Sequence, residues 1–218
     1  MIASPALAGP WTSPSGNQDS FGNPLDFTYS NGGDINGFFG DPLLIGNEFF
    51  FSTGFAVNAS NGGTSQQTDT VSFDVLANPG LAFSSIMVTA FGSYAITTEG
   101  SVDVVADLSM SENPGAGSLE RTFTGSLNTD VAFPINTPGS GVWNGDAAVN
   151  VEFVFPSPHN DIHISLFNDV IAIAGPQGSA AINIQFQDLM IGFVVVPEPA
   201  SLALLTLGGG LLLIRRRR

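Results

Sequence analysis

The side chains best suited to metal chemistry lie in one short stretch of the chain, PHNDIHIS. His159, Asp161 and His163 alternate along it, so on an extended strand all three point to the same side. Two imidazoles and a carboxylate can bind a divalent metal and leave coordination positions open. Same-face neighbours on a strand are roughly 6.6 Å apart, so a shared ion would require a bulge. Because Ile162 and Ile164 fall on the opposite side, the stretch is equally typical of a half-buried strand. We expect that second interpretation and no metal.

A second stretch, Asp34-Ile35-Asn36-Gly37, begins like a calcium-binding loop. Oxygen-bearing side chains alternate in it, and a glycine follows where such a loop turns. The third oxygen ligand and the closing glutamate are absent at the required offsets. We therefore expect a turn here. We expect no cofactor. Ca²⁺ is the one ion that we keep as a candidate, because the chain is rich in acidic side chains.

Other catalytic chemistry finds little support in the chain. It contains no cysteine, which excludes thiolate nucleophiles, thiolate metal sites and disulfides. No G-x-S-x-G nucleophile motif is present. The many acidic residues could supply a carboxylate pair for glycoside hydrolysis, but no residue stands out as a member of one. We expect a protein that is not an enzyme, with a carbohydrate-active hydrolase or lyase as an alternative.

The C-terminal tail reads VPEPASLALLTLGGGLLLIRRRR from Val196 to Arg218. Pro197 and Pro199 flank Glu198 and hold the backbone extended, in the form that a protease can bind. Residues 200–214 are uncharged and, as a helix, reach roughly 22 Å, which is short of a bilayer core of about 30 Å. The segment thus predicts a marginal membrane span. Four terminal arginines favour the cytoplasmic side, which places the preceding body outside.

This tail resembles the PEP-CTERM sorting tail, which joins a Pro-Glu-Pro signature, a short membrane segment and a basic terminus. The resemblance implies processing by exosortase, a membrane-embedded, transpeptidase-like enzyme of Gram-negative bacteria that produce exopolysaccharide. The processing motif would be Val196, Pro197, Glu198 and Pro199, and the membrane stop signal would be Arg215, Arg216, Arg217 and Arg218. Cleavage near Pro197 to Pro199 would release the body or attach it at the cell surface. A plain C-terminal tail anchor is the alternative.

The chain divides into three segments. Ala6-Leu7-Ala8 fits the small-x-small pattern that precedes a signal-peptidase cut, so we expect residues 1–8 to be the remnant of a signal peptide whose start codon lies upstream. A disordered amino terminus is the alternative. Residues 9–196 have the length of one large all-β domain with a substantial core. Residues 197–218 form the sorting and anchor segment.

The body is strongly acidic. Arg121 is its only lysine or arginine, against eighteen aspartates and glutamates, which gives a formal charge of −17 as the difference between these counts. Nucleic acid is excluded as a partner, because binding to phosphates requires lysine and arginine. Anionic polysaccharide would be repelled unless divalent cations bridge the surfaces. Neutral glycans and Ca²⁺-dependent contacts remain open.

Alternation of apolar and polar residues with a period of two dominates the body. It is most regular in four stretches: 70–76, 101–110, 149–155 and 181–187. Four less regular candidates are 49–57, 82–91, 121–127 and 162–174. Stretches rich in Gly, Pro, Asn and Ser separate them, and nothing predicts a helix within the body. We expect an antiparallel β-sandwich of about eight strands, of which a jelly roll is one form, followed by one short C-terminal transmembrane helix. The first forty residues predict a long arm or an edge strand.

These observations predict an exported protein of the cell surface or extracellular matrix, anchored transiently in the inner membrane before processing. Its function is expected to be structural or adhesive, with extracellular polysaccharide as a candidate partner. A glycan-binding, lectin-like module, with or without Ca²⁺, is the alternative. Fold class alone does not separate these functions.

Overall fold

The computed structural model describes residues 9–112, 122–150 and 160–197. Within these ranges the chain forms antiparallel β-strands and no helix. The expected all-β, antiparallel sandwich is therefore confirmed. No helix in the described part of the chain is long and apolar enough to cross a membrane, and the predicted helix at residues 200–214 lies outside that part.

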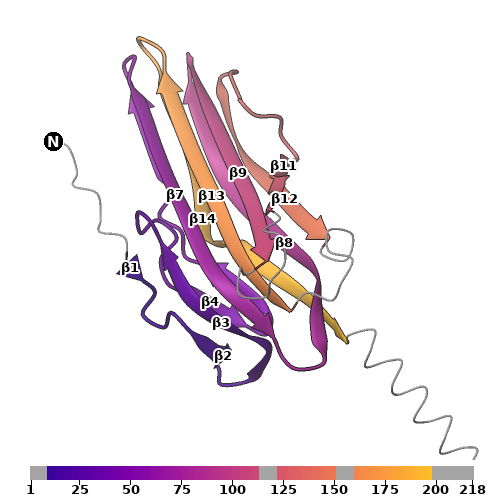
Figure 1. Ribbon diagram of the computed structural model, residues 1–218. Coiled ribbons are helices and arrows are strands. Elements are labelled where there is room, and N and C mark those ends of the chain that lie inside the picture. The colour runs from indigo at the N-terminus through magenta and orange to yellow at the C-terminus, as the bar shows by residue number, and fades with distance from the viewer. Residues whose placement is uncertain (1–8, 113–121, 151–159, 198–218) are drawn as a thin grey trace, which may run out of the picture.

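One layer, sheet A, has seven strands in the order β1-β3-β7-β13-β9-β10, with β2 paired to β3. Its strands are β1 (Gly9–Pro10), β2 (Gly16–Gln18), β3 (Pro24–Asp34), β7 (Thr64–Ala77), β9 (Gly100–Glu112), β10 (Thr122–Ser126) and β13 (Asp161–Ala174). The long strands β7, β13 and β9 lie side by side in the nearer layer of Figure 1.

The other layer, sheet B, also has seven strands, in the order β11-β12-β8-β14-β5-β4, with β6 paired to β14. Its strands are β4 (Pro42–Ile45), β5 (Glu48–Phe51), β6 (Ala56–Ser60), β8 (Leu81–Thr97), β11 (Asn128–Thr129), β12 (Gly139–Asn150) and β14 (Ser179–Pro197). Successive long strands β7, β8, β9, β12, β13 and β14 alternate between the two sheets, so each connection among them crosses from one layer to the other.

Aromatic rings fill the space between the sheets. Phe27 and Phe73 of sheet A meet Phe49 and Phe193 of sheet B, with ring centroids 5.1 Å apart for Phe27 and Phe193 and 4.7 Å apart for Phe49 and Phe73. All four rings are buried. Phenylalanine suits this position because its ring buries a large apolar area and needs no polar partner.

The regular strand predictions are confirmed where the structure describes them. Val71, Phe73 and Val75 of β7 face the core, as do the alternate residues of 101–110 in β9 from Val102 to Met110, and the residues between them, which include Val105, face outward. The predicted strand at 149–155 overlaps β12 only as far as residue 150, and the rest of it lies outside the described residues.

The prediction for 49–57 and the prediction for the first forty residues differ in part from the structure. The stretch 49–57 divides into β5 and β6, which pair with different parts of β14. In place of the expected long arm or edge strand, the first forty residues contain three strands: β1 and β2 lie at the edge of sheet A beside β3, and β3 alternates buried and exposed side chains over much of its length. Leu25, Phe27 and Tyr29 show this alternation in the sequence, whereas the buried positions at the end of the strand are Gly32 and Asp34, which carry no apolar side chain.

Candidate functional site

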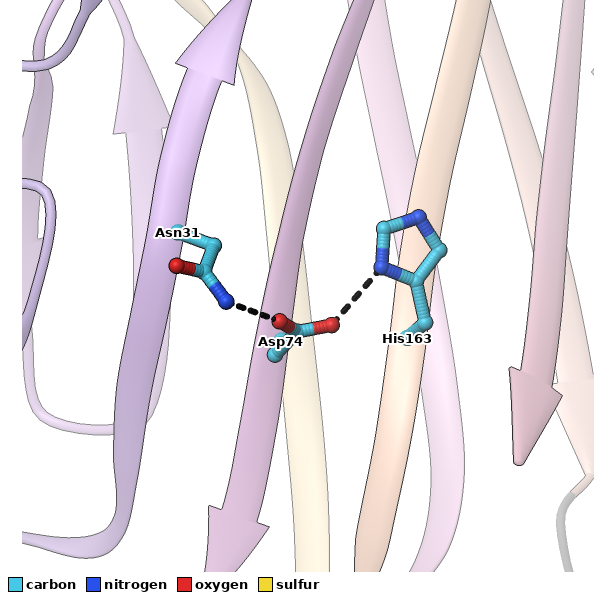
Figure 2. Close-up of polar contacts among 3 residues, drawn as sticks. All are labelled: Asn31, Asp74 and His163. Carbon is cyan, nitrogen blue, oxygen red and sulfur yellow. Dashed lines mark hydrogen bonds and ion pairs between the residues drawn. The ribbon is translucent and has the colours of Figure 1, made fainter. Parts of the chain in front are cut away.

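His163, one of the candidate metal ligands, lies on the outer face of sheet A. His163 on β13 stands directly opposite Asp74 on β7 in the antiparallel register, and its Nδ1 lies 2.7 Å from Asp74 Oδ1. Asn31 of β3 donates from Nδ2 to Asp74 Oδ2 over 2.6 Å. Figure 2 shows the resulting chain of three side chains from three neighbouring strands. The carboxylate therefore fixes the orientation of the imidazole.

A carboxylate that orients an imidazole also occurs in catalytic sites, where a nucleophile or a bound substrate lies beside the imidazole. His163 is 40% exposed, and it lines neither of the two surface hollows described below. A general base acts on a substrate that a pocket holds within hydrogen-bond reach. On an open sheet face, the geometry favours a stabilising cross-strand contact rather than catalysis.

The proposed metal set His159, Asp161 and His163 is only partly placed. His159 lies outside the described residues, Asp161 begins β13, and His163 is engaged by Asp74. Among the described residues, no group of three or more His, Cys, Asp and Glu side chains could hold a metal ion.

Sequence reasoning did not find Asp74 and Asn31 as partners of His163. Asp74 is 89 residues away from His163 in the chain. The period-two pattern of 70–76 predicted only that Asp74 faces outward. A register irregularity between Ser30 and Gly33 lies beside Asn31, which has a φ of 56°. Asparagine adopts this left-handed conformation more readily than most residues. No local pattern in the sequence indicates which strands would pair.

The stretch from Asp34 forms a turn, as expected. Asp34 Oδ2 accepts hydrogen bonds from the backbone N–H groups of Phe39 and Gly40. Gly37 has a φ of 78°, which favours glycine. Asn36 donates from its backbone N–H to Asp69 and from its side-chain amide to the backbone carbonyl of Thr68.

The outer face of sheet B carries a shallow hollow of about 580 Å³. One row of side chains crosses it, strand by strand in register: Phe50 on β5, Met190 on β14, Thr89 on β8, Asp146 on β12 and Asn128 on β11. A second row adds Phe91, Asn144 and Asp130. We call this set the sheet B hollow. It combines two half-buried aromatic rings with a larger number of amide, hydroxyl and carboxylate groups.

A fixed carboxylate borders the sheet B hollow. Asn144 donates to Asp130 from its backbone N–H at 2.8 Å and from its side-chain amide at 2.9 Å. These bonds favour the charged form and lower the pKa of Asp130 below its ordinary 3.8. Asp130 is therefore a permanent hydrogen-bond acceptor at neutral pH and is poorly suited to act as a general acid.

A second hollow, of about 320 Å³, lies between the N-terminal strands and β4. Trp11 and Tyr29 form its apolar part, and both are almost fully buried. Asp41 at its rim accepts a hydrogen bond from the backbone N–H of Thr12. This hollow has the smaller volume of the two.

The tail motif begins inside the sheet. Val196 and Pro197 are the last residues of β14 and pair with Ala82 and Leu81 of β8. Glu198, Pro199 and Arg215 to Arg218 lie outside the described residues. The structure thus places the first two residues of the proposed processing motif at the end of a strand that is central to sheet B.

Several solved structures have a distant likeness to the chain. TmCBM61 in complex with β-1,4-galactotriose is 15% identical, with 64% of this chain and 70% of that one covered and a TM-score of 0.25. A family 29 carbohydrate-binding module is 10% identical, with 86% and 91% covered and a TM-score of 0.24. Eiger TNF from S. frugiperda is 12% identical, with 65% and 90% covered and a TM-score of 0.23. Likenesses at this level carry no conclusion about function. No protein with curated annotation matches the chain.

The tail gives a specific match. Residues 195–218 match the family model of the PEP-CTERM protein-sorting motif, which confirms the resemblance read from the Pro-Glu-Pro signature, the apolar run and the terminal arginines. This motif directs export and a transient attachment to the membrane. The chain is therefore an exported protein that carries a C-terminal PEP-CTERM protein-sorting motif.

Proposed function

We propose that the exported sandwich is a non-catalytic adhesive module that binds a neutral glycan in the sheet B hollow. An exosortase-like enzyme of a Gram-negative bacterium that produces exopolysaccharide would process the tail. The body would then act at the cell surface or in the extracellular matrix. The observation that carries the proposal is the row of side chains from Phe50 to Asn128, which places aromatic, apolar and polar groups side by side across five strands.

The chemistry of this row suits a sugar. Phe50 and Phe91 are half-buried, and an aromatic face packs well against the C–H groups of a pyranose ring. Asn128 and Asp146 are exposed, and their amide and carboxylate groups can bind hydroxyls. The acidic body repels anionic polymers and leaves neutral glycans unaffected, so the charge supports a neutral ligand.

Two other functions compete with this one. A hydrolase would require a carboxylic acid with a raised pKa beside a second carboxylate. Asp130 and Asp146 both line the hollow, but the hydrogen bonds from Asn144 lower the pKa of Asp130, which argues against that role. A purely structural role needs no ligand and predicts that the hollow binds no glycan.

The experiment is a glycan-binding assay of the full-length chain, kept soluble with mild detergent, on an array of neutral and anionic oligosaccharides with and without Ca²⁺. We expect binding that is restricted to neutral glycans. The double variant Phe50→Ala/Phe91→Ala should weaken it at least about tenfold, since each aromatic contact contributes roughly 0.5–1.5 kcal/mol.

The matched control is Val142→Ala, which removes an exposed apolar side chain from β12 outside the hollow. Its binding should equal that of the unmodified chain. If no glycan on the array binds, the proposal is overturned and the purely structural role is favoured. Equal loss of binding in the control and the double variant would place the site elsewhere.

A further inference from the structure

Three buried polar side chains lie on the inner face of sheet A. Asp34 ends β3, Asp69 lies on β7 and Asn168 lies on β13, and these three strands are neighbours in the sheet. Asp69 and Asn168 stand directly opposite each other in the register. Their exposed fractions are 9% for Asp34, 2% for Asp69 and 0% for Asn168. We call these three residues the buried polar cluster.

The cluster holds negative charge without a basic partner. The only lysine, arginine or histidine among the described residues is His163, and its contact is with Asp74 on the outer face. Backbone N–H groups satisfy part of the carboxylates: Asp69 accepts from Asn36 and Phe38. A buried charge normally requires a charged partner or a metal ion as well.

The lack of a basic partner affects the pKa of the Asp34 carboxyl group. Burial, and after it the neighbouring Asp69 carboxylate, raise the pKa of Asp34, against the lowering effect of the backbone N–H groups of Gly40 and Phe39. Its Oδ2 accepts both of these backbone hydrogen bonds. A cation between the two carboxylates would remove the repulsion between them.

Asn168 is an independent sign of a missing partner. Its side-chain oxygen and nitrogen are both buried and neither has a hydrogen-bond partner among the residues that the structure describes, although buried amides are nearly always paired. It stands opposite Asp69 on the neighbouring strand, and both side chains are buried on the inner face of sheet A. An amide oxygen and two carboxylates are hard oxygen donors, the kind that Ca²⁺ prefers and that zinc and copper do not.

We propose that Asp34, Asp69 and Asn168 form a structural calcium site between β3, β7 and β13. The ion would neutralise the two carboxylates, accept the Asn168 oxygen as a ligand and complete its coordination with water. This site differs from the calcium loop suggested by the sequence around Asp34, because two of its ligands come from other strands. It is independent of the sheet B hollow.

The test is thermal unfolding of the full-length chain in mild detergent, first in EDTA and then in CaCl2. We expect Ca²⁺ to raise the Tm by about 5–10 °C when it exceeds its Kd roughly a hundredfold. Isothermal titration should give one tight Ca²⁺ per chain. NaCl at matched ionic strength measures the general effect of screening the acidic surface.

Two variants separate the site from general charge effects. Asn168→Leu replaces the unpartnered amide with an apolar group of similar volume, so it should fold and lose the calcium-dependent rise. Asp34→Asn keeps an oxygen that can accept the backbone hydrogen bonds and should weaken Ca²⁺ binding at least about tenfold. Asp107→Asn, on the outer face of β9, is the control and should keep the full rise.

The proposal is overturned if Ca²⁺ raises the Tm of the unmodified chain no more than NaCl does. That result would indicate that the two carboxylates share a proton instead. It is also overturned if Asn168→Leu and Asp34→Asn both retain the rise seen in the Asp107→Asn control. In either case the glycan assay on the sheet B hollow is unaffected.

Discussion

Acidic side chains in this protein bind backbone amides where other proteins use lysine or arginine. Asp19, Asp34, Asp69 and Asp130 each accept hydrogen bonds from backbone N–H groups of nearby turns or strands. The chain contains no lysine, and its only arginine before the tail is Arg121, so backbone donors are what remains to stabilise the carboxylates. Such bonds favour the ionised form when the group is not strongly desolvated.

Asp130 shows how this affects the pH dependence of stability. Its pKa in the folded protein lies below the ordinary 3.8 because Asn144 donates to the carboxylate. The stabilisation is therefore fully present above about pH 3.8 and is lost as the pH falls through the lowered folded-state value. We expect Asp130→Asn to be less stable than the unmodified chain at pH 7 and to approach it at about pH 2.5.

Urea unfolding at both pH values measures this difference through the midpoint concentrations. Asp107→Asn serves as a comparison, because within the described ranges the Asp107 carboxylate accepts its hydrogen bond from the side chain of Ser126. A gap between Asp130→Asn and the unmodified chain that is the same at both pH values would contradict the role assigned to the Asp130 charge.

At the scale of elements, close approach of strands in sheet B depends on a glycine. Gly92 on β8 stands opposite Trp143 on β12, which is fully buried. A Cβ at Gly92 would lie 2.0 Å from the backbone oxygen of Asn183 on β14 and 2.5 Å from Trp143 Nε1. The indole therefore occupies the space that any other side chain at position 92 would need.

We predict that Gly92→Ala lowers the free energy of unfolding by about 2–3 kcal/mol, because neither a backbone oxygen nor a buried indole can move aside easily. Gly192→Ala is the matched control on β14 of the same sheet. Its Cβ would meet nothing closer than 3.6 Å, so its stability should change by less than about 1 kcal/mol. Urea unfolding checks both, and equal destabilisation of the two variants would contradict the packing argument.

At the scale of the whole molecule, the sorting motif and the folded body share residues. The motif match begins at residue 195, and β14 continues to Pro197. Val195 packs against the core, and Phe193, two residues before it, is buried among the aromatic rings. The body therefore extends to the processing motif without a linker, and a cut beyond Pro197 would leave every core contact of the described strands in place.

We predict that the mature protein from a native producer ends near Pro197 to Pro199 and is found in the medium or matrix fraction. Intact-mass measurement of the fractions checks this. Because β14 is retained, a chain that ends at Pro197 should have the same Tm as the body of the full-length chain. A C-terminus that still carries Arg218, recovered from membranes, would indicate a permanent anchor and contradict the processing.

The sequence by itself determined the class of the protein. Period-two alternation in stretches such as 70–76 and 101–110 predicted strands and the face that each buries, since side chains of a strand alternate between its two sides. The Pro-Glu-Pro signature and the terminal arginines identified the sorting motif, because all parts of this motif lie in one contiguous segment and do not depend on the fold of the body. The absence of cysteine and lysine limited the chemistry and the partners.

Only the tertiary structure decided which residues meet. Phe50, Thr89, Asp146 and Asn128 share a row because β5, β14, β8, β12 and β11 are neighbours in one sheet, and Asp74 reaches His163 across 89 residues of sequence. Strand order and register depend on the combined packing of both sheets, and a local pattern of alternation is the same for every order. Asn168 also looked like an ordinary polar residue until its burial opposite Asp69 made it a candidate ligand.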